Sequence, residues 1–116
     1  MNKKIIEIAS KEIVVPDDTD ELVRIRDIII PPDFKKTNVK YYKIKKVVDY
    51  YEKYGMLDKP ISIYPEIYYN SRHFECSPNE LYLLDEYSRY IAARYYLRLK
   101  VVPVKYISLY DVNYNE

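Results

Sequence analysis

The sequence predicts an α+β fold, a small mixed sheet with two main helices. Three features predict it: strand-like apolar runs in the first third, a helical period that starts near residue 38, and further alternation of strands and a helix after residue 60. The chain has 116 residues, of which 48% are apolar and 32% charged, a composition that fits one folded domain. We expect residues 22–107 to form its body, residues 1–21 to add N-terminal strands and a turn, and residues 108–116 to be a tail.

Composition excludes several classes of site. Gly55 is the only glycine, so neither a P-loop nor a dinucleotide-binding glycine fingerprint can be built, since both need several residues without Cβ near phosphate. Cys76 is the only cysteine, which excludes a disulfide framework and a cysteine-based zinc site within one chain. No stretch approaches the roughly 18 uncharged apolar residues of a membrane span, and the first apolar run is too short for a signal peptide. We therefore expect a cytoplasmic protein without membrane partners.

The first third of the chain has strand patterns. Residues 5–9 and 12–15 are short β-type runs, and turn-forming residues follow them. A third run, 22–30, ends at Pro31 and Pro32, because neither proline can donate a backbone hydrogen bond to a sheet. We expect three strands here, the first two forming a hairpin or a pair of edge strands.

The period then changes from two residues to that of a helix. One apolar face is formed by residues at i, i+3, i+4 and i+7, namely Ile44, Val47, Val48 and Tyr51. Asp33 begins the preceding loop, Asn38 is the expected N-cap, and Gly55 follows the last turn, where a residue that tolerates positive φ commonly ends a helix. The helix should therefore end near Tyr54.

The second half repeats the alternation. Residues 60–64 and 81–84 have strand patterns, Asp85 is the expected N-cap of a helix over residues 86–99, and residues 101–107 form a buried strand. The apolar positions of all these periods should share one core, consisting of Ile25, Ile28, Ile44, Val47, Val48, Ile61, Ile63, Leu83, Ala92, Val102 and Val104.

Charge is concentrated in one segment. Residues 35–53 carry seven lysines against Asp49 and Glu52, although the net charge of the chain is only +1. Such a stripe is either a solvated helix face or a surface that attracts phosphate. The 16 tyrosines have two interpretations as well, the coding bias of an AT-rich genome or a set of base-stacking faces.

Four joints between these elements carry a family resemblance. They are a strand that runs into Pro31-Pro32-Asp33, the run Gly55-Met56-Leu57-Asp58-Lys59-Pro60-Ile61, a strand that feeds a helix at 83–93, and the strand Val102-Pro103-Val104. In this order they resemble the ParB/sulfiredoxin-like fold, found at the N-terminus of partition ParB proteins and in ParB-like nucleases. The resemblance covers residues 22–107.

The third joint matches the family's Gly-Glu-Arg-Arg-x-Arg-Ala box in degenerate form. Glu86 stands at the glycine, Tyr87 at the glutamate, Ser88 at the first arginine and Arg89 at the second. Sulfiredoxins resemble the chain at this joint too, but their catalytic cysteine would fall at Tyr87. The missing thiol argues against sulfinic-acid reductase activity.

The resemblance implies a nucleotide site at this joint, for CTP or ATP with Mg²⁺. Its expected residues are Lys43, Asp85, Glu86, Ser88 and Arg89, with an anion near the Ser88 and Arg89 backbone amides at the helix N-terminus. The negative charges of Asp85 and Glu86 disfavour a second anion there. Arg89 therefore has two open roles, a phosphate ligand or an ion pair with Asp85 or Glu86.

Two further sets of residues have weaker motifs. The resemblance to ParB-like small-molecule kinases makes Asp33 a candidate base or Mg²⁺ ligand, although an ordinary turn aspartate fits the same pattern. His73 and Cys76, in the loop at 65–79, lack the two further ligands that a closed metal site needs, and nothing in the sequence would activate the thiol. We expect no metal site there.

The leading functional hypothesis is a stand-alone ParB-like protein of a plasmid, phage or other mobile element, acting on or near DNA. Lys35, Lys36, Lys40 and Lys46 are the candidate contacts to the DNA backbone, without sequence specificity, because no recognition-helix domain follows the last strand. One alternative is a nucleotide-dependent phosphotransferase, and another is a degenerate domain retained as a protein-interaction module. Nucleotide hydrolysis or nuclease activity stays open, although no cluster of metal-binding carboxylates is evident.

Overall fold

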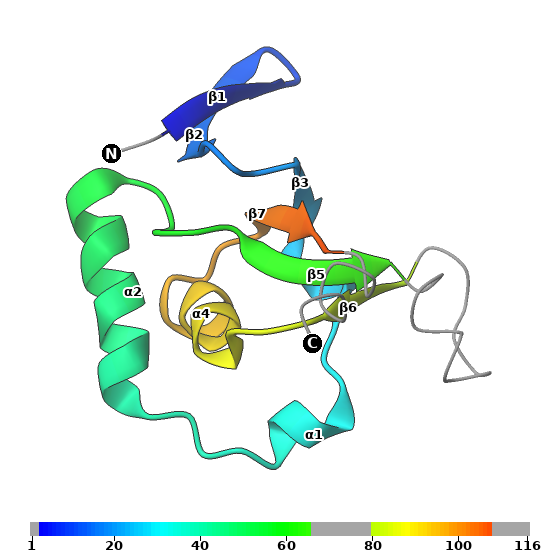
Figure 1. Ribbon diagram of the computed structural model, residues 1–116. Coiled ribbons are helices and arrows are strands. Elements are labelled where there is room, and N and C mark those ends of the chain that lie inside the picture. Colours follow the sequence, from blue (N-terminus) through cyan, green and yellow to red (C-terminus); the bar gives the residue numbers. More distant parts are fainter. Residues whose placement is uncertain (1–2, 66–79, 108–116) are drawn as a thin grey trace, which may run out of the picture.

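The computed structural model describes residues 3–65 and 80–107 (Figure 1). Its strands, in chain order, are β1 (Lys3–Ile8), β2 (Lys11–Pro16), β3 (Glu21–Arg24), β4 (Ile28–Ile29), β5 (Ile61–Pro65), β6 (Leu81–Leu83) and β7 (Val101–Tyr106). β1 and β2 form a separate antiparallel hairpin. The other five strands form one sheet, so the body of the molecule begins at β3.

The five-stranded sheet is mixed, in the order β3-β7-β5-β6-β4. β3 is antiparallel to β7 and β5 is antiparallel to β6, whereas the β5–β7 and β4–β6 pairs are parallel. The centre of the sheet is its most deeply buried part, since Ile61 pairs with Val104 and both are fully buried. This agrees with the predicted small mixed sheet.

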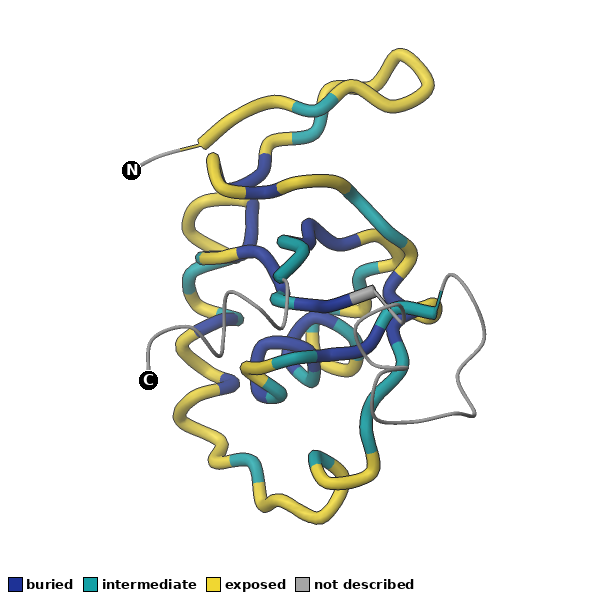
Figure 2. The backbone as a smooth tube through the Cα atoms, turned by 45° about the vertical axis from the view of Figure 1, so that its right-hand side comes forward, coloured by how far each residue is buried: buried dark blue, intermediate teal, exposed yellow. Residues whose placement is uncertain are grey.

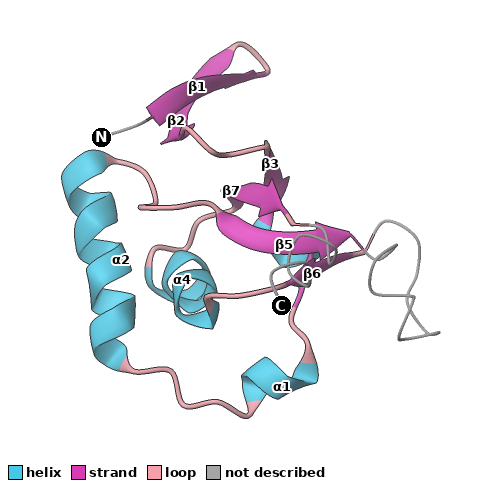
Figure 3. Cartoon of the chain, viewed as in Figure 1, coloured by secondary structure: helices cyan, strands magenta, loops and turns pink. Residues whose placement is uncertain are grey.

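The helical elements are η1 (Ile25–Asp27), α1 (Pro32–Lys35), α2 (Tyr41–Tyr54), α4 (Tyr87–Ile91) and the π-helical segment η2 (Ala92–Tyr96). α4 and η2 are continuous and are called the α4–η2 helix below. α2 packs against this helix, and both lie beside the sheet (Figure 3). Gly55 ends α2 as expected, with a φ of 74° and its N–H donated to the Tyr51 carbonyl oxygen at 2.7 Å.

The predicted core residues are in one cluster. Ten of the eleven are buried together, and Val48, the eleventh, is half-buried and packs against them. Figure 2 shows the buried backbone in the sheet and the α4–η2 helix, while most of the β1–β2 hairpin is exposed and only its last two residues, Val15 and Pro16, are buried. Each apolar face therefore has a partner, which is what drives this arrangement of layers.

Four local expectations were wrong. The run at 22–30 is not one strand: η1 divides it, and its two halves pair at opposite edges of the sheet. Asp33 lies in the short helix α1, which Pro32 starts at a position where its missing N–H costs nothing. The N-cap of α2 is Lys40 rather than Asn38. The last helix ends at Tyr96 rather than Leu99, since the chain leaves the helical region at Arg98, with a φ of 54°.

Two further expectations concern membrane spans and the segments that lie outside the described residues. No helix among residues 3–65 and 80–107 is long and apolar enough to cross a membrane. His73 and Cys76 lie outside the described residues, as do the tail at 108–116 and most of the loop at 65–79.

Candidate functional site: the start of the α4–η2 helix

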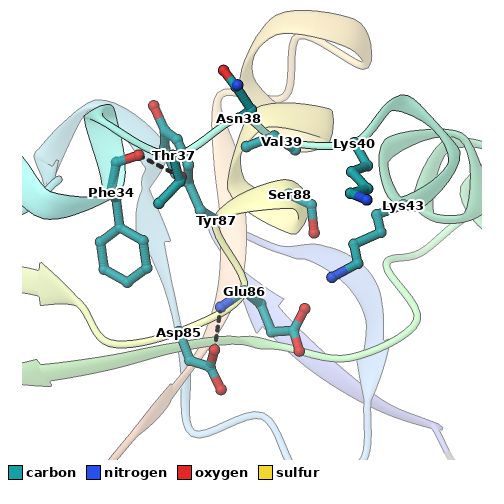
Figure 4. A pocket seen from close by; sticks show the side chains of 10 residues that line it. All are labelled: Phe34, Thr37, Asn38, Val39, Lys40, Lys43, Asp85, Glu86, Tyr87 and Ser88. Carbon is teal, nitrogen blue, oxygen red and sulfur yellow. Dashed lines mark hydrogen bonds between the residues drawn. The ribbon is translucent and has the colours of Figure 1, made fainter.

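A cavity of about 310 Å³ opens where the start of α2 faces the start of α4 (Figure 4). We call it the Lys43 cavity. It is lined by Phe34, Thr37, Asn38, Val39, Lys40, Lys43, Asp85, Glu86, Tyr87 and Ser88. The cavity therefore lies between two segments that are far apart in the sequence, residues 34–43 and residues 85–88.

Both lysines of this cavity come from the first turn of α2. Lys40 is the N-cap residue, and Lys43 lies three residues further along the chain, with its N–H donated to the Lys40 carbonyl oxygen at 3.1 Å. Their exposed side chains extend toward the strand-to-helix joint, and Lys43 points between Glu86 and Ser88 in Figure 4. The cavity therefore has a cationic wall on the α2 side.

The opposite wall is the strand-to-helix joint itself. Glu86 is the N-cap of α4 and has a φ of 59° and a ψ of 57°, so it occupies the left-handed region. An L residue with a Cβ pays roughly 1–2 kcal/mol there, whereas glycine does not. The position that the resemblance aligns with the family's glycine therefore has the backbone conformation that favours glycine.

Asp85 has a different role from the expected N-cap. Its Oδ1 accepts the backbone N–H of Glu86 at 2.7 Å, which fixes the turn just before the helix. The Arg89 and Tyr90 amides both donate to the Glu86 carbonyl oxygen, at 3.0 and 3.3 Å. The first two amides of the helix, those of Tyr87 and Ser88, have no intrahelical acceptor and stand at its positive end.

Arg89 is buried, with 9% of its side chain exposed, and pairs with an aspartate that sequence reasoning missed. Its Nε and Nη2 donate to Oδ1 and Oδ2 of Asp58, each at 3.0 Å, in a bidentate arrangement. The expected pair with Glu86 is only a 3.9 Å contact from Nη1, and none of the described ion pairs joins Arg89 to Asp85. The structure therefore gives Arg89 an ion pair that ties α4 to the loop before β5.

The environment of Asp58 changes its ionisation. Partial burial alone would raise its pKa, but the Arg89 hydrogen bonds and charge, with help from backbone amides, outweigh burial and leave the pKa of Asp58 below its usual value. The carboxylate is thus held in its charged form, and the pair is a structural contact at neutral pH.

A second cavity of about 310 Å³ adjoins the first, and we call it the Lys46 cavity. Lys43, Glu86 and Ser88 line both cavities, and the other residues around the second are Tyr42, Lys46, Val47, Asp58 and Arg89. Nη1 of Arg89, the guanidinium nitrogen that Asp58 does not bind, faces Glu86 Oε2 at 3.9 Å on this side.

The structure brings together most of the residues expected in a cofactor site. Lys43, Asp85, Glu86 and Ser88 line the Lys43 cavity, and Arg89 lines the adjoining one. The lysines proposed for DNA divide between places: Lys40 and Lys46 line the two cavities, whereas Lys35 and Lys36 are exposed on α1 and just after it. Asp33 is exposed on α1 and lines neither cavity, although its neighbour Phe34 does.

Two participants were missed because their roles depend on tertiary contacts. Asp58 lies 31 residues from Arg89, and its only local signal was its place in the Gly55-to-Ile61 joint. Tyr87 packs on Phe34 in a tilted arrangement and stacks on Tyr90, with ring centroids 5.6 and 6.1 Å apart, so it forms an aromatic wall of the cavity. Burial is the main cause that raises the pKa of Tyr87, and the nearby tyrosines raise it further, so the Tyr87 hydroxyl stays protonated. Among the described residues, no three His, Cys, Asp or Glu side chains are grouped to hold a metal ion.

Comparison with known proteins supports the fold. The structure is similar to sulfiredoxin from Arabidopsis thaliana, with a TM-score of 0.54, 20% sequence identity and coverage of 76% of this chain and 85% of that one. It is also similar to C-terminally truncated ParB from Caulobacter crescentus complexed with CTP-gamma-S, with a TM-score of 0.56 and 18% identity. That match covers 79% of this chain but 46% of the ParB chain, so the protein spans about half of that relative.

The chain has the ParB/sulfiredoxin-like fold. No protein-family model matches it, and no curated protein is detectably similar to it in sequence. At 18–20% identity, the two structures share the fold with this chain and nothing finer follows for its site.

Proposed function

We propose that this ParB-like domain binds a nucleoside triphosphate across the Lys43 cavity, with the phosphates between Lys43 and the start of α4. The observation that carries the proposal is the meeting, around one cavity, of Lys40 and Lys43 with Tyr87 and Ser88, whose amides are the first two of the helix and have no intrahelical acceptor. Backbone N–H groups at a helix N-terminus and nearby ammonium groups are the standard protein ligands of phosphate. The CTP analogue in the ParB structure supports the same ligand class.

Asp85 and Glu86 make Mg²⁺ part of this proposal. A bare triphosphate would be repelled by the two carboxylates, whereas Mg²⁺ is commonly held by one or two carboxylates together with substrate phosphates. Asp85 has Oδ2 left after Oδ1 accepts the Glu86 amide, and Glu86 is exposed at the cavity. The residues present fit a Mg²⁺–nucleotide complex in which the ion arrives with the phosphates.

Isothermal titration with CTP and with ATP, each with and without Mg²⁺, tests the proposal. We expect binding that requires Mg²⁺, and a loss of tenfold or more in affinity in Lys43→Ala, because an ammonium–phosphate hydrogen bond contributes about 1.5–3 kcal/mol. Lys45→Ala is the matched control, since Lys45 is exposed on the same helix, pairs with Asp49 and lines neither cavity. Equal affinities in wild type and Lys43→Ala would contradict the site, and absence of binding to both nucleotides would favour the protein-interaction module.

The geometry supports binding better than catalysis. A phosphotransferase that used Asp33 as its base would need that carboxylate beside the phosphates, and Asp33 does not line the cavity. We therefore keep phosphotransferase activity, nucleotide hydrolysis and nuclease activity as secondary candidates.

We infer the cellular setting from the fold relationship and the charge pattern. The proposal is a cytoplasmic protein of a plasmid, phage or similar element that acts on or near DNA, with Lys35, Lys36, Lys40 and Lys46 contacting backbone phosphates. All four lysines are exposed. Duplex binding by a Lys35→Ala, Lys36→Ala double variant should show a salt dependence that is shallower by about two phosphate contacts, and an unchanged slope would argue against these residues.

A further inference from the structure

A larger cavity, of about 620 Å³, lies at the other end of the α4–η2 helix. We call it the arginine cavity. It is lined by Arg24, Ile25, Arg26, Arg94, Arg98, Leu99, Lys100 and Val101. The antiparallel pairing of β3 with β7 brings these two stretches together, with Arg24 opposite Val101 and the Ile25 amide donated to the Lys100 carbonyl oxygen at 3.0 Å.

Five of the eight lining residues are cations and none is acidic. Within the described chain, Asp27 is the one acid within 4 Å of any of them, and it contacts Arg24 through an exposed pair at 3.0 Å. The cavity therefore gathers more positive charge than the net charge of +1 of the whole protein. A concave wall on which four of the five cations have no acidic partner among the described residues attracts anions strongly, because the cavity focuses their field.

The helix dipole explains only part of this cluster. Cations near the end of a helix are favoured by its negative pole, which accounts for Arg94 and Arg98. It does not account for Arg24 and Arg26, which come from β3 and η1. Arg98 also has a φ of 54°, a left-handed conformation that is costly for a residue with a Cβ, so stability alone does not favour arginine there.

The neighbours that orient Arg94 are aromatic and neutral, so within the described residues its positive charge is not paired with a carboxylate. Its Nη1 donates to the Tyr90 hydroxyl, and its guanidinium lies 5.9 and 5.6 Å from the ring centroids of Tyr90 and Tyr95. These neutral aromatic partners orient the cation by hydrogen bonding and by cation–π attraction. Tyr95 keeps 59% of its surface exposed next to this arginine.

The lining of the cavity also includes three apolar residues, Ile25, Leu99 and Val101, and Val101 is 41% exposed. A ligand that fits apolar and cationic lining residues beside an exposed tyrosine ring has flat apolar groups linked by several phosphates. Single-stranded nucleic acid has this chemistry, since its bases are free to stack while its backbone meets the cations. In a duplex the base faces are already stacked on one another, so none is free to stack on Tyr95.

We propose that the arginine cavity binds single-stranded nucleic acid, with the backbone on Arg24, Arg26, Arg98 and Lys100 and a base on Tyr95. The site is independent of the nucleotide proposal, because no residue of the arginine cavity lines the Lys43 or Lys46 cavity. No residue of the lysine-rich segment at 35–53 lines the arginine cavity either.

Fluorescence anisotropy of a labelled oligothymidylate, titrated at several salt concentrations, tests the backbone contacts. For single strands the slope of log K against log salt is about −0.7 per phosphate neutralised, so removing two cations should reduce its magnitude by about 1.4. The test variant is Arg26→Ala with Arg98→Gly, since both residues are exposed and glycine suits the positive φ at position 98. Its thermal stability should stay at or above that of wild type, so a loss of binding would not be a loss of fold.

A charge-matched control is Lys11→Ala with Lys59→Ala, two exposed lysines outside the three cavities. Tyr95→Ala tests stacking separately: affinity should fall about tenfold while the salt slope stays the same, because no phosphate contact is removed. Tyr54→Ala, another exposed tyrosine at the far end of α2, should leave affinity unchanged. An abasic strand should bind wild type and Tyr95→Ala equally.

Three outcomes would overturn the proposal: no binding to the oligothymidylate at low salt, the same slope in wild type and the arginine double variant, or tighter binding of a duplex of equal length. Loss of binding in Lys40→Ala or Lys46→Ala, with full binding in the arginine variant, would assign nucleic acid to the lysine segment. That result would refute the arginine cavity and leave the proposed function intact. Loss of nucleotide binding alone would leave the arginine cavity unaffected.

Discussion

The two ends of the α4–η2 helix use arginine in opposite ways. At the start of the helix Arg89 is buried and bound through two hydrogen bonds to Asp58, and the acids Asp85 and Glu86 stand beside it. At the other end Arg26 and Arg98 are exposed, and no ion pair of the described chain includes either of them. The first end is nearly neutral and the second is strongly positive.

This difference teaches that a residue's match to a motif does not reveal how much of its charge is free. Arg89 matches the family's box, yet two of its five N–H donors are bound to Asp58 and its charge is paired there. Arg26 and Arg98 match no motif, yet they line a cavity in which no acid faces them. Burial and pairing, rather than sequence position, decide which arginine remains able to bind an anion.

The largest effect should come from removing the buried arginine. Arg89→Met keeps much of the side-chain volume but leaves the Asp58 carboxylate unpaired in a site where only 31% of it is exposed. Loss of one partner of a buried pair costs about 3–5 kcal/mol, and the partial exposure of Asp58 places the expected loss near the lower figure. Urea unfolding followed by circular dichroism measures it.

If Arg89→Met unfolds at the same urea concentration as wild type, the contrast between a structural arginine at one end of the helix and free arginines at the other is wrong. Asp58→Asn should also destabilise the protein, because it leaves the buried guanidinium with a neutral acceptor. The double variant should be much less destabilised than the sum of the two single losses, since the second substitution removes a group already without its partner. Additive losses would mean that the pair contributes no coupling.

The Asp58–Arg89 pair also predicts how the free energy of unfolding changes at acid pH. Partial burial acts to raise the pKa of Asp58, but the hydrogen bonds and charge of Arg89, together with backbone amides, outweigh it and leave the pKa below its usual value. The stabilisation from this carboxylate is therefore full above its unfolded pKa of about 3.9 and is lost as pH falls through the lower folded pKa. The difference in unfolding free energy between wild type and Asp58→Asn should shrink below about pH 4.

Arg89→Met should weaken that dependence. Without the arginine, the two largest influences that lower the pKa of Asp58 are gone, so its pKa is higher than in wild type and the unpaired carboxylate is neutralised more readily as pH falls. Urea midpoints of Arg89→Met measured at neutral and acid pH should therefore approach those of wild type in acid. A gap that widens on acidification would contradict the assigned cause of the shift.

A smaller, stabilising effect is expected at the turn before α4. Glu86→Gly relieves a positive φ that costs roughly 1–2 kcal/mol, partly offset by the greater entropy of unfolded glycine, for a net gain of about 0.5–1 kcal/mol. It also removes a negative charge from both cavities at this end, so the binding of a nucleotide should depend less on Mg²⁺ than in wild type. Ser88→Gly, inside the helix, is the control and should destabilise. A lower melting temperature in Glu86→Gly would be contrary to this account.

Local patterns in the sequence predicted most of the fold. Ile44 and Val47 were found by their helical period, Gly55 by its capping position, and Ile61 and Val104 by strand alternation. These features depend on neighbours a few residues away, so they can be read along the chain. The division of residues 22–30 between two edges of the sheet could not be read, because η1 is short and pairing partners lie far away in sequence.

The candidate site was predictable in outline but not in its pairing. Lys43 and Ser88 were expected near one another from the family resemblance, and they do line one cavity. Arg89 was expected either to bind phosphate or to pair with Asp85 or Glu86 on its own helix turn, whereas tertiary folding supplied Asp58 from 31 residues away. The arginine cavity had no sequence signal at all, since its cations are spread over residues 24–26 and 94–100.

The smallest effect on stability should come from the exposed end of the helix, in Arg26→Ala. Arg26 contributes no ion pair in the described chain and little buried area, and substitutions at such surface positions usually change unfolding free energy by less than about 0.5 kcal/mol. Removing one of several like charges from the cavity even relieves repulsion, so a slight gain is within expectation. Urea midpoints of Arg26→Ala and Arg89→Met, measured side by side, give the contrast directly. A large loss in Arg26→Ala would show that the arginine cavity is a structural cluster after all, and the argument for a free anion-binding surface would fail with it.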